Sequence, residues 1–373
     1  MRTDVPTNLK ACVTFSLLTL LTLSLPAQHG EPPVTAPFGK GLDSICVNDW
    51  WNHKKSPIVD VHVPRDQVVA FGIYTVHAGV LKLSAQLFPL YPKETRQVRL
   101  EVQRDGKWFE LASQPVNDIG WATCFRVTNW DATLDTRYRL RHGEAAMFEG
   151  LVRKAPVKRE IVLAALSCNS KKDRGMRANY VRNLRHQDPD LLFFAGDQSY
   201  DHKQHTAAWL KFGLQFRDVF RDRPCITIPD DHDVGHANLW GESGAVAKLG
   251  GGADGGYLHH PEYVRMVERA QTAHLPDPFD PAPVGQGIGV YFTEMTVGNV
   301  SFAILEDRKF KTGPAGTIPQ QGPRPDHIRN ANYDPKTVDV EGLVLLGERQ
   351  HKFLAEWGKP QEGVVMRAGL SQT

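Results

Sequence analysis

Two patterns of hydrophobic and polar positions succeed one another along this chain of 373 residues. From about residue 56 to 154, apolar and polar residues alternate with a period of two, which is typical of half-buried strands. Turn signals such as Arg104-Asp105-Gly106-Lys107 separate the short runs, at a spacing typical of β-sandwiches. The runs lie at 58–63, 68–76, 81–90, 97–102, 108–111, 125–127 and 138–140. We therefore predict an N-terminal all-β sandwich of the immunoglobulin or fibronectin III type over residues 46–155.

The pattern changes after Pro156. Three runs are continuously apolar, which is typical of strands buried on both faces of a sheet, and they cover 161–166, 191–195 and 225–229. Apolar residues at helical spacing lie between them, within 174–187 and 209–222. This β-α-β-α-β order predicts parallel strands with right-handed crossovers. We expect an α/β domain over residues 160–373.

The C-terminal third combines shorter elements with long loops. Runs at 290–296 and 300–305 flank Gly298-Asn299, a strong hairpin signal. A helix is expected at 346–357 and a strand at 364–370. The segments 235–256 and 311–341 are rich in glycine or proline and lack periodicity, so we predict loops there.

The N-terminus has the pattern of a secretory signal peptide over residues 1–27. Arg2 and Lys10 precede an apolar run from Ala11 to Leu25, and Pro26-Ala27-Gln28 offers a cleavage site. A membrane anchor is the alternative, but about 15 apolar residues are short for a membrane span, and no later segment is longer. We therefore predict a secreted or periplasmic protein without a stable membrane span.

Composition narrows the range of partners. The formal charge is +2 with scattered basic residues, which gives no electrostatic argument for nucleic acid. Cys12 lies in the predicted signal, and the other four cysteines show no CxxC or zinc-finger spacing. An exported protein can pair Cys46 with Cys124, whereas Cys225 lies in an apolar run and is expected in the core. The oligomeric state stays open.

Polar clusters follow each of the three buried strands. They are Ser167-Cys168-Asn169, Gly196-Asp197-Gln198-Ser199-Tyr200 and Asp230-Asp231-His232-Asp233. Each residue alone has an ordinary interpretation, such as a helix cap, a packed aromatic ring or a solvated histidine. Together, at the carboxyl ends of parallel strands, they predict a shared site. Carboxylates bind hard cations, while thiolate, phenolate and imidazole suit transition metals, so the sequence predicts a metal centre.

These three clusters resemble the first three motifs of the PhoD-like alkaline phosphatases, in the calcineurin-like metallophosphoesterase superfamily. Leu305-Glu306-Asp307-Arg308 and Leu346-Gly347-Glu348-Arg349-Gln350 are similar to two further family patterns, LDxR and LGxxQ. The resemblance covers most of the chain from about 46 to 373. It implies an αββα layered metallophosphoesterase domain behind an N-terminal β-sandwich, and an exported hydrolase of phosphate mono- or diesters, small or polymeric.

The resemblance also implies roles for single residues. The implied metal ligands are Cys168, Asp197 as the bridging carboxylate, Tyr200 for Fe(III), and Asp231 for a second ion, Ca²⁺. His232 is the implied acid that protonates the leaving group. Asn169 and Arg308 are candidate substrate contacts, with an ion pair to Asp307 as the alternative for Arg308. Zn²⁺, Mn²⁺ and Mg²⁺ remain alternative metals, and the tyrosine is the argument for iron.

One departure from the family pattern affects the expected activity. The superfamily completes its site with histidines from C-terminal GHxH-like or GDxH-like turns. The histidines after His232 lie outside such a context, at positions 236, 259, 260, 274, 327 and 351. Residues 364–373 resemble the strand before those motifs, so a C-terminally incomplete domain is expected. The alternative function is a non-catalytic or fragmentary family member whose β-sandwich binds a partner.

Overall fold

The structure is a computed structural model that describes residues 58–157, 159–170, 176–198, 200–201, 204–325 and 327–372. The predicted signal peptide and Cys46, one half of the suggested disulfide, lie outside these residues. Within them, no helix is both long and apolar enough to cross a membrane. Across the described ranges, the fold is rich in β-structure, with four separate sheets and few helices.

Two antiparallel sheets form the predicted sandwich. The first has the order β1-β2-β5, from strands Val69–His77, Val80–Leu87 and Ala122–Thr128. The second has the order β4-β3-β6-β7, from strands Lys107–Pro115, Gln97–Arg104, Thr136–His142 and Ala146–Val152. Alternate side chains of both sheets are buried in a common core, among them Tyr74, Leu83, Leu100, Tyr138 and Phe148. Period-two patterning located most of these strands in the sequence.

Two details of the sandwich differ from the prediction. The run from Ile58 to Val63 alternates like a strand but forms none. Val61 is buried, and Asp60 accepts a hydrogen bond from the backbone N–H of His62 at 2.9 Å, so a local turn replaces a ladder. Strand β7 was not predicted, because Gly150 and Glu149 interrupt its apolar pattern.

The predicted parallel sheet is confirmed. Strands β8 (Leu163–Leu166), β9 (Leu191–Phe194) and β10 (Cys225–Thr227) pair in parallel in the order β10-β9-β8. Helices α2 (Arg177–Gln187) and α3 (His205–Phe220) connect them, as the periodicity indicated. The carboxyl ends of the three strands therefore lie along one edge of the sheet.

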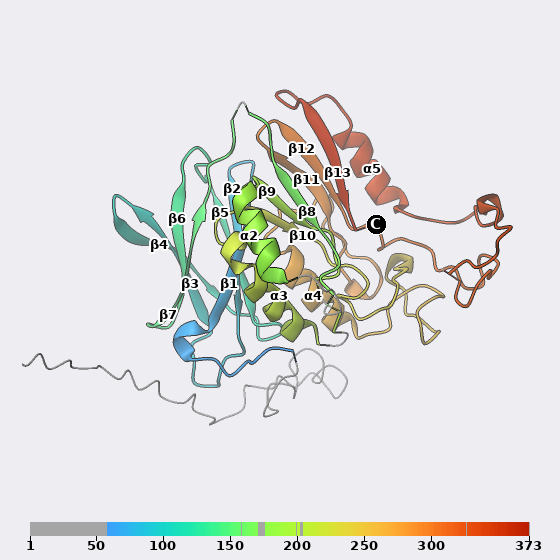
Figure 1. The fold of residues 1–373 in the computed structure, drawn as a ribbon, viewed down its shortest axis with the longest axis horizontal. Helices are drawn as coiled ribbons and strands as arrows, with labels where there is room; N and C mark the ends of the chain where they lie inside the picture. The colour runs from blue at the N-terminus through green and yellow to red at the C-terminus, as the bar shows by residue number, and fades with distance from the viewer. Residues whose placement is uncertain are drawn as a thin grey trace, which may run out of the picture.

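A second three-stranded sheet faces the parallel one. It contains β11 (Phe292–Val297), β12 (Val300–Leu305) and β13 (Met366–Ser371), with the predicted hairpin antiparallel and β13 parallel to β12. Apolar side chains of both sheets fill the space between them, among them Leu191, Phe193, Ile226, Met295, Phe302 and Ile304. Helix α5 (Gly347–Trp357) packs on the far face of the second sheet, through Phe353 (Figure 1).

Helix α4, from Pro261 to Thr272, was not predicted. Its signal was present in the sequence, because Tyr263, Val264, Met266 and Val267 are buried at helical spacing and Pro261 occupies the first turn. The His260 side chain caps the helix by accepting a hydrogen bond from the N–H of Glu262 at 3.1 Å. The adjoining glycine-rich segment 235–256 obscured this start.

An aromatic cluster joins the sandwich to the parallel sheet. Phe71 of β1 lies 5.7 Å from Trp209 and 6.1 Å from Phe220, measured between ring centroids. Phe194 of β9 contacts the same helix α3, with its ring 5.0 Å from that of Phe212. One hydrophobic core therefore runs from the sandwich through α3 to the sheet that carries the predicted chemistry.

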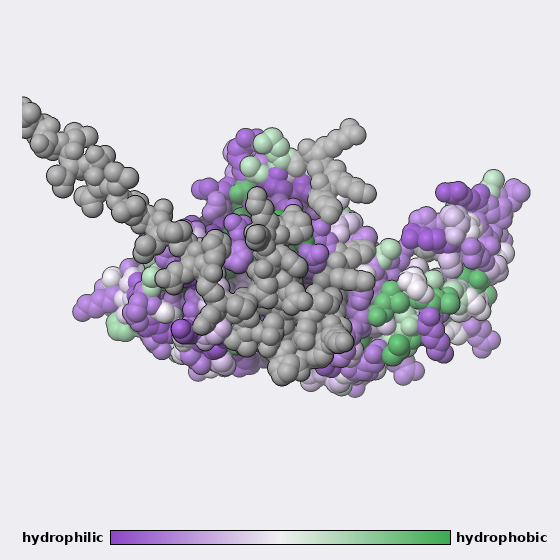
Figure 2. Space-filling view, turned by 90° about the horizontal axis from the view of Figure 1, so that it is seen from below, coloured by the Kyte–Doolittle hydropathy of each residue, from purple (hydrophilic) through white to green (hydrophobic). Residues whose placement is uncertain are grey.

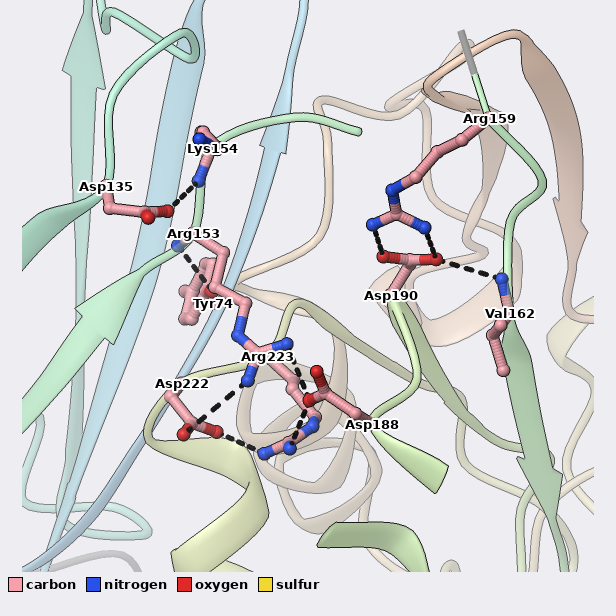
Figure 3. A network of polar contacts seen from close by, with 10 residues as sticks. All are labelled: Tyr74, Asp135, Arg153, Lys154, Arg159, Val162, Asp188, Asp190, Asp222 and Arg223. Carbon is pink, nitrogen blue, oxygen red and sulfur yellow. Dashed lines mark hydrogen bonds and ion pairs between the residues drawn. The ribbon is translucent and has the colours of Figure 1, made fainter. Parts of the chain in front are cut away.

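The segment between the sandwich and β8 is tied down by ion pairs (Figure 3). Arg159 binds both carboxylate oxygens of Asp190, whose Oδ2 also accepts from the backbone N–H of Val162 at 2.9 Å. Arg153 and Arg223 both donate to Oδ1 of Asp188, at 2.8 and 2.6 Å. These contacts lie before β9 and β10, at the opposite end of the sheet from the strand-end clusters.

The loop predicted at 311–341 is observed, and the irregular segment continues to the start of α5 at Gly347. It extends away from the sheets at the right of Figure 1. Hydrophobic surface is visible on this projection in Figure 2. Exposed apolar side chains in this part of the chain include Ile328, Val340, Leu343, Val344 and Leu345.

The approach of α3 to β1 predicts the effect of one substitution. A Cβ atom at Gly213 would lie 1.8 Å from the Phe71 ring, so Gly213→Ala must push the two elements apart. We expect it to lower the free energy of unfolding by about 1–3 kcal/mol in urea denaturation. Gly251→Ala, where a Cβ meets no neighbour, is the control and should change stability by less than about 0.5 kcal/mol. Equal stability of both variants would contradict this close packing.

Candidate metal centre

The turns after β8 and β9 bring the predicted site residues together through unusual backbone conformations. Gly196 has a φ of 86°, and a Cβ there would lie 2.4 Å from the Cβ of Asp230. Only glycine therefore lets the turn after β9 approach the turn after β10 so closely. Cys168 and Asp197 both have a φ of 58°, a conformation that residues other than glycine adopt infrequently and often at functional sites.

Asp197 lies at the centre of the cluster. The Tyr200 hydroxyl donates to its Oδ2 at 2.8 Å, and the Cys168 thiol approaches the same oxygen at 3.7 Å. Its Oδ1 accepts from the backbone N–H of His232 at 3.3 Å. One carboxylate thus contacts residues of all three strand-end clusters, while its role as a bridging ligand stays a prediction.

Asp231 and His232 complete the group. Single ligand atoms of Asp197, Asp231 and His232 all lie within 4.8 Å of one another. The rings of Tyr200 and His232 pack with centroids 4.2 Å apart. The structure therefore brings together the five residues for which metal or acid roles were predicted, while the roles themselves stay predictions.

Several carboxyl groups in this cluster have strongly raised pKa values. Burial, followed by the charge of Asp231, raises the pKa of Asp197 to about 7. Burial raises the pKa of Asp230 to about 8 against the opposing effect of Arg308, and burial raises the pKa of Asp233 to about 8. Burial is the main cause of all three shifts, so these carboxyl groups keep their protons to a higher pH than an exposed aspartate does.

The pKa values of the His232 and Tyr200 rings are shifted by the same buried, charged surroundings. Burial lowers the pKa of His232, and the charge of Arg308 adds to this, while Asp231 acts in the opposite direction. Burial raises the pKa of the Tyr200 phenol, and the nearby thiol of Cys168 and carboxylate of Asp197 raise it further. Without a bound cation, the phenol therefore stays protonated and donates to Asp197.

The two candidate substrate contacts occupy different surroundings. Arg308 forms an ion pair with Asp230, including a contact from Nη2 to Oδ2 at 3.2 Å, so it lies at the cluster. Its predicted alternative partner was Asp307. The Asn169 side chain donates to Gln215 at 3.1 Å and accepts from Arg177, which fixes the first cluster to helices α2 and α3.

Sequence reasoning missed the role of Asp233. Its Oδ2 accepts hydrogen bonds from the backbone N–H groups of Asp197 at 2.8 Å and of Asp230 at 3.0 Å. This single oxygen therefore holds the turns after β9 and β10 in register. Its position as the third acidic residue of the run Asp230-Asp231-His232-Asp233 was visible, but a side chain that folds back onto two backbone groups leaves no distinct sequence pattern.

A metal ion fits this donor set. Asp197 and Asp231 offer buried carboxylate oxygens within reach of the His232 imidazole, and the Cys168 thiol and Tyr200 phenol adjoin Asp197. A bound cation would neutralise the crowded carboxylates and favour their ionised forms. The donor set mixes hard and softer ligands, so it suits several metals.

Comparison with known proteins gives a likeness of fold. No protein-family profile matches this sequence, and no curated protein matches it. The chain is similar to a solved structure of PhoD, with a TM-score of 0.57 and 15% identity over 79% of this chain. The chain spans 60% of the length of that protein. A cycloisomaltooligosaccharide glucanotransferase from a Paenibacillus species aligns over 56% of this chain and 26% of its own, at a TM-score of 0.22 and 12% identity, which carries no argument.

The bonds of Asp233 predict a loss of metal affinity without loss of a ligand. Asp233→Ala leaves the N–H groups of Asp197 and Asp230 without this acceptor, so metal affinity should fall about 10–100-fold in calorimetric titration. Asp233→Asn retains an acceptor oxygen and should lose less. Asp254→Ala is the matched control, because Asp254 also accepts from two backbone N–H groups, but outside the cluster. Unchanged affinity in Asp233→Ala would refute this role.

The raised pKa values predict how stability depends on pH. Between about pH 4 and 8, the folded metal-free protein keeps protons on Asp197, Asp230 and Asp233 that the unfolded chain releases. The free energy of unfolding should therefore fall as the pH rises through this window.

Urea denaturation with a chelator, at about pH 5 and about pH 8, measures this dependence. Asp197→Asn should reduce the fall, and a saturating divalent cation should suppress it by neutralising the carboxylates. A metal-free protein that becomes more stable between these two pH values would contradict the prediction.

Proposed function

We propose that this protein is a metal-dependent hydrolase of phosphate mono- or diesters, with the layered fold of the metallophosphoesterases. The observation that carries the proposal is the convergence of Asp197, Asp231 and His232 at one edge of a parallel sheet. The fold likeness to PhoD supports it, as does the order of the strand-end motifs along the chain. The divisions 46–155 and 160–373 are part of the proposal.

Each residue of the cluster takes a role that its position supports. Asp197 would be shared between two ions, Cys168 and Tyr200 would hold the first, and Asp231 would hold the second. Bound ions supply Lewis acidity and lower the pKa of a water nucleophile, as in other two-metal hydrolases. Asp233 and Asn169 hold the turns that carry these ligands, through bonds to the backbone and to the helices.

His232 is the proposed general acid. A nitrogen of its ring carries the proton that passes to the departing oxygen of the ester. Packing of the ring against Tyr200 fixes its plane, and the charge of Asp231 opposes the loss of that proton on burial. The imidazole also lies within ligand distance of the carboxylates, so metal ligation is the alternative role for His232.

The metals and the location are further parts of the proposal. Tyr200 and Cys168 favour Fe(III) at the first position, and the carboxylates favour Ca²⁺ at the second, with Zn²⁺, Mn²⁺ and Mg²⁺ as alternatives. The N-terminal pattern of Arg2, Lys10 and the following apolar run supports export to the periplasm or beyond the cell.

The proposal predicts metal-dependent hydrolysis of p-nitrophenyl phosphate or bis(p-nitrophenyl) phosphate. Purified protein loaded with each metal in turn should hydrolyse at least one of them, and a chelator should abolish the rate. Asp197→Asn, which removes the bridging charge, should lower kcat at least about 100-fold. Asp105→Asn is the control, since Asp105 lies in the turn between β3 and β4, and should keep full activity.

Esters with different leaving groups distinguish the two possible roles of His232, general acid and metal ligand. If it is the acid, His232→Asn should slow an alkyl phosphate much more than p-nitrophenyl phosphate, whose leaving group needs little protonation. If His232→Asn instead slows both esters equally and the purified variant holds less metal, His232 is a metal ligand. Absence of hydrolysis with every metal would refute the enzyme proposal and favour a non-catalytic protein.

A further inference from the structure

Lys311 is an uncommitted cation in the turn that follows β12. Its backbone is fixed on both sides, because its N–H donates to the carbonyl of Arg308 at 3.3 Å and its carbonyl accepts from the N–H of Glu242 at 3.1 Å. Its side chain is half-buried. Among the described residues, no carboxylate lies within ion-pair distance of its ammonium group, and no hydrogen bond engages it.

The neighbouring cations of the same turn are committed. Arg308 is paired with Asp230. Lys309 is buried between Glu268 and Glu306, where it links α4 to the end of β12. Lys311 thus differs from both in having no structural partner, although all three follow one strand.

The charges around Lys311 belong to the candidate metal centre. Lys311 closes a turn onto the carbonyl of Arg308, and the guanidinium of Arg308 pairs with Asp230 of that centre. The charged groups that act on the Lys311 ammonium are Arg308, Asp307, Asp230 and Asp231. A positive charge beside a cluster of carboxylates attracts a negatively charged substrate, which the carboxylates alone would repel. A lysine on a flexible stem binds a phosphate oxygen as a point charge without demanding fixed geometry.

We propose that Lys311 binds the terminal phosphate of the substrate and thereby selects dianionic phosphomonoesters over monoanionic diesters. This inference rests on the proposed function. A phosphomonoester carries nearly two negative charges near neutral pH, whereas a diester carries one. A second positive charge beside Arg308 therefore stabilises a bound monoester more than a bound diester. The preference for monoesters would then come from Lys311 itself.

The test compares two substrates in variants of the full chain loaded with the most active metal. Lys311→Met removes the charge but keeps the length, and Lys311→Arg keeps the charge. As a control, Lys107→Met removes the lysine that begins strand β4 of the sandwich. We expect Lys311→Met to lower kcat/KM for p-nitrophenyl phosphate about tenfold, mainly through a higher KM. For bis(p-nitrophenyl) phosphate, kcat/KM should fall only about twofold. Lys311→Arg and Lys107→Met should keep the wild-type ratio.

Binding of inorganic phosphate provides a second readout that does not need turnover. Calorimetric titration of the metal-loaded protein should show about tenfold weaker phosphate binding in Lys311→Met, with unchanged thermal stability. An unchanged ratio of monoester to diester hydrolysis would overturn the inference. If the wild type hydrolyses neither ester, the proposed function fails, and the inference then depends on titration alone. Equal phosphate affinity of wild type and Lys311→Met, or no binding by either, overturns it.

Discussion

Crowding of negative charge at the ends of parallel strands is the constraint on which the rest of this structure depends. Asp197, Asp230, Asp231 and Asp233 lie within two turns, all of them buried. Arg308 pairs with one of them, and the others repel one another in a poorly solvated environment. Such an arrangement is unfavourable for folding unless the surrounding structure holds it in place and a cation neutralises it.

Apolar packing around strand β9 holds the turns that carry these aspartates in place. Alternate residues of β9 face opposite layers, with Phe194 packed on α3 and Phe193 packed on the second sheet. The strand therefore cannot shift without disturbing both layers. Gly196 then turns the chain within contact of Asp230, and Asp233 bonds the backbone of both turns. The sandwich contributes through Phe71, which fixes α3 from the opposite side.

The sequence predicted the features that repeat and missed those that depend on single contacts. The apolar runs before Cys168, Asp197 and Asp230 predicted the parallel sheet, because burial on two faces leaves a continuous apolar pattern. Strands β9 and β10 are buried as expected, whereas β8 is a partly exposed edge strand despite the same pattern. The alternation at Ile58–Val63 predicted a strand that does not form, since alternation alone does not specify which segment a strand pairs with. Asp233 and Lys311 have ordinary neighbours in sequence, and only the tertiary structure distinguishes Lys311 from the buried, paired Lys309.

The two ends of the parallel sheet show what the crowded charge means. At the amino end, Arg153, Arg159 and Arg223 match Asp188, Asp190 and Asp222 in ion pairs that fix the linking segment (Figure 3). There the protein provides arginines for each of these three aspartates, as a structural network requires. At the carboxyl end the same chain leaves its aspartates in excess over Arg308 and Lys311. Because the fold balances buried charge with its own arginines at one end, the excess of aspartates at the other supports the proposal that cations from outside the chain bind there.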